Sequence, residues 1–386
     1  MVNYFTLDLL FHLIIFQSVL ILVLVTNLII TSRARRHHVP PDLPHVSILV
    51  PARNEEKNIS SCLISLLDQE YPSFEVVVLD DQSSDKTGEI ITQIAGTNSG
   101  MIVLEGSEPP PDKVGKNWAC SQLAAAAGGD LLFFTDADTI HHPRCLVDSV
   151  TALLGEKADL LTGFPRQILA TPGERLLVPF FSWAALAFIP LGLAYRIPLP
   201  ALSIAVGQMM LFRKKTYHEI GGHSAVSSSI VDDLELVRNV KRAGMRWRVV
   251  SIADRISCRM YRGGREALEG FVKNLFAAFD FRLIPFIFVL GWLGLMFWDP
   301  LVVLFLKIMG AAPAAPPLQL AACLILSILV WALPYFHLRI PVRYSFYYPF
   351  IILANLYAGF LSVRRSISGR LEWKGRPLSQ EHWKWL

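Results

Sequence analysis

The chain has 386 residues, enough for one large domain with additional elements or for two ordinary domains. Apolar residues make up 53% of it and the mean hydropathy is +0.42, which excludes a purely soluble enzyme and predicts membrane segments. The net charge is 36 − 32 = +4, so a nucleic-acid partner is not indicated. The five cysteines form no Cys-x-x-Cys pair, which argues against a disulfide framework or zinc site and indicates a reduced compartment.

The first element is an uncharged apolar segment, Leu9–Ile30, which spans about 33 Å as a helix and can cross a bilayer. A signal peptide is the alternative, but this apolar core is longer than a typical one and no small-residue cleavage site follows. Three arginines come directly after it, namely Arg33, Arg35 and Arg36. By the positive-inside rule, residues 1–32 are expected to form a transmembrane helix that exits into the cytoplasm.

Short apolar runs then alternate with helical patterns. The expected strands are 46–50, 75–79, 101–104 and 131–134, and the expected helices between them are 58–67, 86–95 and 113–127. This alternation predicts an α/β fold with a mostly parallel sheet and helices on both faces. Ligand-type residues follow three of the strands, at 51–56, 80–85 and 136–138. Because open α/β sheets bind ligands at the C-terminal ends of their strands, these three clusters predict one site.

Two carboxylates end the fourth strand, in Asp136-Ala137-Asp138. On a continuing strand, residues i and i+2 point the same way. Two like charges that close require a cation or a proton between them, and hard oxygen ligands favour Mg²⁺ or Mn²⁺, with nucleotide phosphates completing the coordination. The alternative is that an isolated Asp-x-Asp only caps the strand and opens a turn.

Several longer motifs give this pair a context. They are VSILVPARNEE (46–56), VVVLDDQSSDKTGEII (76–91), GKNWA (115–119), FTDADT (134–139), GQMMLFRKKTYHEIGG (207–222) and IVDDLELVRNVKRAG (230–244). In this order and spacing they resemble glycosyltransferase family 2 with its GT-A fold, a Rossmann-like nucleotide-diphospho-sugar transferase fold, over roughly residues 45–275. Within that family the chain is most similar to membrane-bound lipid-modifying members of the hopanoid-associated, carotenoid and ceramide types.

The resemblance implies a nucleotide site at the ends of the first two strands. The residues expected to line it are Pro51, Ala52, Arg53 and Glu55. Asp81 corresponds to the carboxylate that accepts a hydrogen bond from the uracil imide, which implies a UDP-sugar donor.

The resemblance also implies roles around the diphosphate. Asp138 would bind the metal that bridges it, with Asp136 nearer to the ribose and donor sugar, and the metal would neutralise charge on the leaving UDP. Gly207 belongs to the donor-binding set by the same resemblance. Lys116 could add a positive charge at the diphosphate, and the alternative is a solvated lysine near the start of a helix.

Asp232 and Asp233 correspond to the family's acidic pair, in which the second carboxylate is the general base. An inverting transfer needs such a base within hydrogen-bond reach of the acceptor hydroxyl. The alternative is that these acids only enrich the first turn of a helix, where negative charge is favourable.

Arg259-Met-Tyr-Arg262 stands where processive relatives carry Gln-x-x-Arg-Trp, and Gly263 replaces the Trp. This departure disfavours processive sugar-polymer synthesis. The two arginines are suited to grip diphosphate oxygens. The alternative is a solvated basic loop next to a membrane.

The apolar stretch 176–194 is nearly long enough to span a bilayer. One crossing here would put Asp138 and Asp233 on opposite sides of the membrane, and Pro179 and Pro190 interrupt the run. We therefore expect a membrane-interfacial segment that forms the entrance for a lipid acceptor. The alternative is a buried helix pair of the soluble domain.

Residues 266–279 carry an apolar stripe at helical spacing, with Lys273 off the stripe. This predicts that 266–282 forms an interfacial helix that follows a cytoplasmic catalytic domain at 45–265. A helix packed on the soluble core would show the same stripe.

The C-terminal region, 283–362, is expected to hold two or three transmembrane helices before a basic tail at 363–386. The segments 283–309 and 318–336 are two spans, whereas 346–361 is apolar but short. If this third segment crosses, the tail emerges on the wrong side, so either it is re-entrant or the helix around Asp299-Pro300 is a hairpin. Trp373-Lys-Gly-Arg376 resembles the tail of lipid glycosyltransferases, which favours a cytoplasmic C-terminus.

The expected function is an inverting hexosyl transfer that depends on Mg²⁺ or Mn²⁺ and takes place at the inner membrane of the cell. One sugar, with glucose favoured, would pass from a UDP-sugar to the hydroxyl or carboxyl of a membrane lipid. A carotenoid or other polyprenoid is the first expected acceptor, and a hopanoid or ceramide-like lipid the second. A processive polysaccharide synthase is the nearest rival, and a non-enzymatic membrane scaffold is disfavoured by the retained carboxylates.

Overall fold

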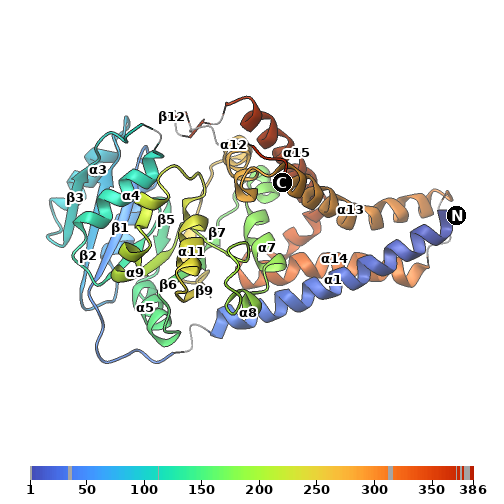
Figure 1. Ribbon diagram of the computed structural model, residues 1–386, viewed down its shortest axis with the longest axis horizontal. Helices are drawn as coiled ribbons and strands as arrows, with labels where there is room; N and C mark the ends of the chain where they lie inside the picture. Colours follow the sequence, from blue (N-terminus) through green and yellow to red (C-terminus); the bar gives the residue numbers. More distant parts are fainter. Residues whose placement is uncertain are drawn as a thin grey trace.

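The computed structural model describes residues 2–33, 37–111, 113–311, 316–370, 372–373, 376–377 and 383–386. An α/β domain is joined to a group of long helices that project from one side of it (Figure 1). The basic residues Arg35, Arg36 and Lys374, on which part of the predicted topology depends, lie outside the described residues.

A seven-stranded sheet forms the centre of the described α/β domain. In spatial order its strands are β3 (Met101–Glu105), β2 (Phe74–Asp80), β1 (Val46–Ala52), β4 (Leu131–Phe134), β8 (Met210–Arg213), β6 (Leu160–Phe164) and β9 (Trp247–Ser251). β8 runs antiparallel to both of its neighbours, and the other adjacent pairs are parallel. The predicted α/β fold with a mostly parallel sheet is therefore confirmed.

Helices cover both faces of this sheet, which is why its central strands are continuous apolar runs. In β1, Ile48 and Val50 join the core on one face and Leu49 joins the core on the other. The helices of the domain are α2 (Ile59–Leu67), α3 (Thr87–Ala95), α4 (Gly115–Ala126), α5 (Cys145–Gly155), α9 (Lys214–Glu219), α10 (Gly222–Ala225) and α11 (Asp232–Arg242).

A smaller sheet joins three short segments of the chain. It consists of β5 (Thr139–His141), β10 (Ile256–Cys258) and β7 (Arg166–Gln167). β5 and β10 are antiparallel, and Cys258 is the register partner of Thr139. This pairing carries the segment before Arg259 to the residue that follows Asp138.

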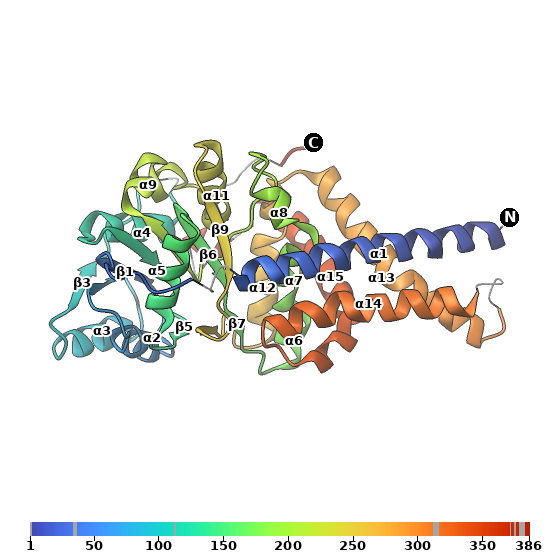
Figure 2. The ribbon, with the colours of Figure 1, turned by 90° about the horizontal axis from the view of Figure 1, so that it is seen from below.

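Four described helices are long and apolar enough to cross a membrane, at Leu9–Arg33, Leu283–Ile308, Pro317–His337 and Val342–Ile367. They belong to α1 (Val2–Arg33), α13 (Leu283–Ile308), α14 (Pro317–His337) and α15 (Tyr348–Ile367), the last preceded by the 3₁₀ turn η2 (Val342–Tyr347). α1 lies beside α14 along the same direction, as Figure 2 shows. These helices associate the protein with a membrane.

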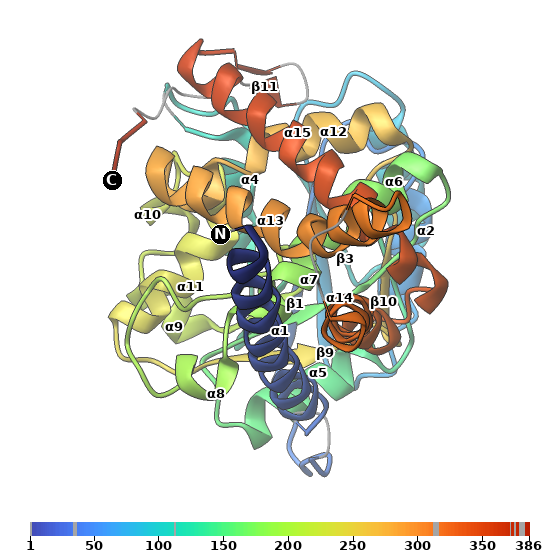
Figure 3. The same ribbon diagram turned by 90° about the vertical axis from the view of Figure 1, so that its right-hand side faces the viewer.

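Two expectations about this region are wrong. α13 is one continuous helix through Pro300, so the hairpin around Asp299-Pro300 does not form. The third C-terminal segment is not confined to 346–361, because its helix continues to Ile367 and includes Arg364 and Arg365 in its last turn. α15 runs across the direction of α1 and α14 rather than along it (Figures 1 and 3). That orientation favours the re-entrant alternative.

The apolar stretch 176–194 does not form one long helix. It is divided into the end of α6 (Pro172–Leu177), α7 (Pro179–Phe188) and α8 (Leu191–Ala194), with breaks at Pro179 and Pro190. α7 packs on α1 and α14, α8 packs on α1, and α6 packs on α15. The Trp183 ring stacks on Trp331 at 3.9 Å, and its Nε1 donates to the Val330 carbonyl at 3.1 Å.

The stripe predicted in 266–279 is buried within the protein. α12 (Gly264–Asn274) is followed by the 3₁₀ turn η1 (Ala277–Phe279), and it packs against α6 and α15. Ser362 of α15 connects the two helices, since its Oγ donates to the Val272 carbonyl at 2.5 Å and accepts from the Phe276 amide at 3.1 Å. The helix is therefore covered by α15 along its apolar side.

Candidate active site

The loops after β1 and β2 meet at one edge of the sheet. Arg53 Nη1 donates to the Asp81 backbone carbonyl at 2.5 Å and lies 3.8 Å from Asp81 Oδ2. Asp81 is 3% exposed. Asn54 and Gln82 both have positive φ, at 52° and 55°. The Asn54 amide donates to Ser83 Oγ at 3.0 Å and Asn54 Oδ1 accepts from the Ser84 amide at 2.8 Å, which joins the two loops. The structure thus brings together residues that are expected to hold the nucleotide.

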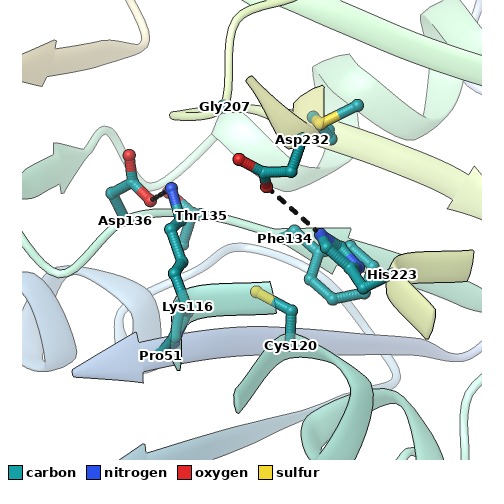
Figure 4. A pocket seen from close by; sticks show the side chains of 10 residues that line it. Pro51, Lys116, Cys120, Phe134, Thr135, Asp136, Gly207, His223 and Asp232 are labelled. Atoms are coloured by element: carbon teal, nitrogen blue, oxygen red, sulfur yellow. Dashed lines mark ion pairs between the residues drawn. The ribbon is translucent and has the colours of Figure 1, made fainter. Parts of the chain in front are cut away.

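The third cluster reaches the same edge through β4. Asp136 Oδ1 lies 2.7 Å from Lys116 Nζ, and both side chains are about a quarter exposed, at 25% and 27% (Figure 4). Lys116 is the second residue of α4, and because it forms this ion pair the alternative that it is merely solvated is wrong. Burial acts to lower the pKa of Lys116, but Asp136 and Asp232 raise it well above its usual value. A permanent positive charge therefore stands beside the Asp-x-Asp segment.

A buried polar network holds the Asp-x-Asp segment in place. Thr135 Oγ1 donates to the Gln208 carbonyl at 2.9 Å and lies within 3.1 Å of Thr139 Oγ1 and of His141 Nε2. Burial lowers the pKa of His141 to about 3, so the ring is neutral. Sequence reasoning missed this network because its members alternate with the acidic residues and carry no pattern of their own.

Asp138 has different surroundings from Asp136. Strand β4 ends at Phe134, so the expectation that both carboxylates point the same way on a continuing strand is wrong. Asp138 Oδ1 is buried and has no hydrogen-bond partner. Burial, Asp136 and Glu55 together raise the pKa of Asp138 to about 7. Such an orphaned carboxylate fits a cation ligand.

Within the described part of the chain, no three His, Cys, Asp or Glu side chains converge to form a complete metal site. Asp138 is the protein group that fits a divalent ion, and oxygens of a nucleotide diphosphate would have to supply further ligands. Asp136 is engaged by Lys116 instead.

At the start of α11, Asp232 lines the same pocket as Lys116 and Asp136, and Asp233 contacts Gly207, another lining residue. Asp233 Oδ2 accepts from the Gly207 amide at 3.1 Å. Asp232 Oδ2 lies 3.6 Å from His223 Nε2 (Figure 4). His223 Nδ1 lies 2.9 Å from the Tyr217 hydroxyl. The two carboxylates are therefore held by different partners.

This difference separates their pKa values. Burial acts to raise the pKa of Asp232, but the hydrogen bond from His223 and the charge of Lys116 lower it to about 2. Burial, followed by the charge of Asp232, raises the pKa of Asp233 to about 6. Asp232 is thus fixed as an anion, whereas Asp233 can take up a proton near neutral pH, as a general base must.

Gly207 lies between the two halves of the site. A Cβ built on it would be 3.6 Å from Lys116 Nζ and 3.6 Å from Asp233 Oδ2. The residues that line the pocket here include Pro51, Lys116, Cys120, Asp136, Gly207, His223 and Asp232. Lys116 and Asp136 thus share a pocket with Asp232 and Gly207, whereas Asp81, Asp138 and Asp233 are not among its lining residues, and their joint role in one site stays a prediction.

The two arginines of the Arg-x-x-Arg motif are held outside this pocket. Arg259 Nη2 lies 3.1 Å from Glu174 Oε1, and Glu174 is fully buried in the capping box of α6. Arg262 is exposed, and its Nη2 donates to Asn58 Oδ1 at 2.6 Å. In this state the motif ties the catalytic loops to α6 and α2, and a grip on diphosphate stays a prediction.

Lys273 is a site residue that sequence reasoning left without a role. It projects from α12 and interacts electrostatically with Asp232, Asp136 and Asp233. Burial, followed by the charge of Lys116, lowers the pKa of Lys273 to about 8. Its position off the apolar stripe of its helix was the signal that could have identified it.

Comparison with known proteins agrees with this geometry. Residues 47–221 match the family model described as Glycosyl transferase family 2. The chain therefore carries a family 2 glycosyltransferase domain. A mannosyltransferase from Pyrobaculum calidifontis, solved with GDP-Man and Mn²⁺, has the same fold, with a TM-score of 0.51 at 18% identity over 90% of this chain and 99% of that one. The fold is thus the GT-A fold.

Two characterised relatives have names that refer to lipids. The chain is 25% identical over 233 residues to 4,4'-diaponeurosporenoate glycosyltransferase of Staphylococcus haemolyticus. This aligned region covers 60% of each protein. It is 29% identical over 238 residues to beta-monoglucosyldiacylglycerol synthase of Trichormus variabilis, which covers 58% of this chain and 49% of that one. The match thus spans about half to three fifths of these relatives.

Proposed function

We propose that this protein is an inverting glycosyltransferase that moves one sugar from a UDP-sugar to a membrane lipid. The observation that carries the proposal is the placement of Asp233, with its raised pKa, across Gly207 from the Lys116–Asp136 pair. A base on one side of a pocket and a charged donor site on the other are what an in-line displacement at a sugar carbon requires.

In the proposed reaction, the acceptor O–H lies against Asp233. Its oxygen attacks the anomeric carbon while the bond from that carbon to the β-phosphate oxygen breaks, and Asp233 takes the proton. The products are the glycosylated lipid, UDP and the protonated carboxyl. Lys116 stands where negative charge develops on the leaving diphosphate, and its firmly held proton keeps it cationic.

A divalent ion, Mg²⁺ or Mn²⁺, would be held by Asp138 and would supply Lewis-acid neutralisation of the leaving diphosphate. The buried, unpartnered Oδ1 of Asp138 supports this assignment. The Mn²⁺ bound in the mannosyltransferase of the same fold supports it further. Arg53 and Asp81 would hold the nucleoside in the crevice between β1 and β2.

The proposed acceptor is an apolar lipid with a terminal hydroxyl or carboxyl, such as a carotenoid or other polyprenoid, and glucose is the proposed sugar. The support is twofold. The relatives are named for a carotenoid-type acid and for a glucosylated diacylglycerol. In addition, helices α6, α7, α8 and α12 contact the bilayer-length helices, so an acceptor in the cytoplasmic leaflet would approach the catalytic domain beside them. The catalytic domain would then lie on the cytoplasmic side of the inner membrane.

The test is to incubate membranes that contain the full chain with labelled nucleotide sugars and identify the labelled lipid by mass. Parallel reactions with UDP-glucose, UDP-galactose, UDP-N-acetylglucosamine and GDP-mannose define the donor. Label in a single-sugar lipid that requires Asp233 supports the proposal. Label confined to a long sugar polymer, or transfer from GDP-mannose alone, would contradict it.

A further inference from the structure

Two of the bilayer-length helices, α1 and α14, end side by side against the catalytic domain (Figure 2). In their last turns Thr31 Oγ1 lies 3.1 Å from His337 Nε2, and α1 also packs on β9. The two apolar spans, Leu9–Arg33 and Pro317–His337, both stop at this end. Because spans of this length match the hydrocarbon core of a bilayer, the lipid headgroups of one leaflet lie at the level of Arg33 and His337.

A polar cavity of about 230 Å³ opens at this level. The residues that line it are Ser32, Ser251, Ala253, Asp254, His337 and Arg339. Its one carboxylate is already engaged by a neighbour, since Arg255 Nη1 lies 3.2 Å from Asp254 Oδ2, whereas Arg339 Nη2 lies 3.9 Å away. The cavity is several times larger than the volume of one water molecule, about 30 Å³. Its hydroxyl, imidazole and guanidinium groups can all donate hydrogen bonds, so the lining suits an anion.

Arg339 reaches this cavity from an unfavourable backbone conformation. Its φ is +56°, in the left-handed region. The chain leaves α14 here in a Schellman motif, in which the Ile340 amide donates to the Tyr335 carbonyl at 2.9 Å. Glycine is the usual residue at this position of the motif, because it has no Cβ to be strained. The backbone alone therefore favours glycine, and the residue that stands there instead adds a guanidinium to the cavity.

We propose that this cavity binds the phosphate group of an acidic phospholipid, an inference that does not depend on the reaction proposed above. Arg339 supplies the positive charge, and the hydroxyls of Ser32 and Ser251 supply further donors. The depth of the cavity favours a lipid headgroup as the source of the phosphate. Arg33, Arg339 and Arg343 all follow apolar spans at this end, and the positive-inside rule assigns such an end to the leaflet that is rich in anionic lipids. The bound lipid joins α1, α14 and the turn after β9, and so fixes the catalytic domain against that leaflet.

The experiment measures thermal unfolding of the purified full chain in detergent with added phosphatidylglycerol, phosphatidylcholine or inorganic phosphate. We expect phosphatidylglycerol to raise the unfolding midpoint, and the other two to have much smaller effects at the same concentration. Arg339→Gly should weaken the apparent affinity for phosphatidylglycerol roughly tenfold or more, because a charged hydrogen-bond donor is lost. Without lipid its midpoint should equal or exceed that of the unsubstituted protein, because glycine relieves the strained backbone.

Arg343→Gln is the matched control. Arg343 is also exposed at this end of α14, but its guanidinium lies 5.5 Å from the centre of the Tyr344 ring and does not line the cavity. The variant removes the same charge and should keep the response to phosphatidylglycerol, whereas Arg339→Gln should lose it as Arg339→Gly does.

Four results would overturn the proposal. The first is the absence of any phosphatidylglycerol effect, or an equal effect of phosphatidylcholine. The second is a phosphatidylglycerol effect that Arg339→Gly retains or that Arg343→Gln loses equally, since the attraction would then be a diffuse one. The third is inorganic phosphate that acts as strongly as the lipid, which would indicate a site for free phosphate. The fourth is a lower lipid-free midpoint for Arg339→Gly with unchanged lipid affinity, which would make Arg339 a purely structural residue.

Discussion

The catalytic assignment depends on one carboxylate. Asp233→Asn keeps the size of the side chain and its contact with the Gly207 amide but removes the base. We expect UDP binding to persist while kcat falls by roughly 10²–10⁴-fold, the range for loss of general base catalysis. Turnover of labelled sugar into lipid measures the effect. Glu235→Gln, on the same helix, is the control, and near-normal turnover in Asp233→Asn would remove the assignment.

The raised pKa of Asp233 predicts a pH dependence. The base acts only when ionised, so kcat/KM should be low in acid and rise through pH of about 6 to a plateau. Besides burial, this pKa depends on Asp232, Lys116, the hydrogen bond from the Leu234 amide and Asp136. A pH–rate profile at saturating metal checks this, and a profile flat from pH 5 to 8 would contradict it.

Gly207 can be tested by its own geometry. Alanine fits there sterically, because the added Cβ meets Lys116 Nζ and Asp233 Oδ2 at ordinary contact distance, 3.6 Å. We expect Gly207→Ala to fold normally and to lose roughly a hundredfold in kcat/KM, since its methyl group occupies space between the donor site and the base. Gly192→Ala, whose Cβ would also have its nearest contact at 3.6 Å, is the matched control. A Gly207→Ala enzyme with normal kinetics would show that the sugar does not pass here.

At the scale of elements, α1 is fixed to the short helices of residues 179–194 by one buried amide. Asn27 Nδ2 donates to the carbonyls of Leu186 and Ile189 at 2.8 Å each, and Asn27 Oδ1 accepts from the Leu191 amide at 2.9 Å. These groups belong to the break between α7 and α8, where Pro190 interrupts the helix and leaves them without helical partners. The Asn27 side chain of α1 thus supplies hydrogen bonds to backbone groups at the break between α7 and α8, in the segment nearest the proposed acceptor.

Asn27→Ala is therefore expected to destabilise the protein. It orphans two carbonyls and one amide, each at a cost of about 1–3 kcal/mol before relaxation. Thermal unfolding in detergent should show a lower midpoint, whereas Thr26→Ala should not, because Thr26 bonds to carbonyls of its own helix on an exposed face. Equal unfolding midpoints for the two variants would mean that the hydrogen bonds of the Asn27 side chain contribute no stability.

At the scale of the whole molecule, the catalytic domain and the long apolar helices are packed together through one apolar core. The sheet and the helical bundle share one continuous apolar core that includes Leu49 of β1, Trp183 of α7 and Trp331 of α14. The catalytic domain is thus packed against the membrane helices rather than tethered to them by a linker. This rigid junction is what would let a lipid headgroup be presented to Asp233 without large motions.

Labelling with an impermeant thiol reagent tests this topology. Ser182→Cys and Leu193→Cys should not react from the periplasmic side, because the segment 176–194 lies on the catalytic side of the bilayer in our proposal. Ala311→Cys, in the connector after α13, should react from that side and is the control. The native cysteines are buried and free, which keeps the background low. Strong periplasmic labelling at Ser182→Cys would contradict the proposed entrance.

The sequence was sufficient for the α/β class and for the strands of the sheet, and it proposed the carboxylates at positions 81, 136, 138 and 233 as candidates for the site. These features are encoded locally, because the apolar run of a buried strand and the acids at its end are neighbours in the chain. The role of Lys116 was left open between two readings, since one cation near a helix start has no local pattern that distinguishes a pocket from solvent.

Only the tertiary structure decided which groups meet. His223 and Lys273 reach the site from segments more than 80 residues beyond Asp136, and the contacts that give them meaning come from helix docking. The tertiary structure also decided whether each apolar segment is covered by other helices of the protein. An apolar stripe records that a helix face is buried but not whether protein or lipid covers it, so the stripe of α12, buried against α15, could not be read from spacing alone.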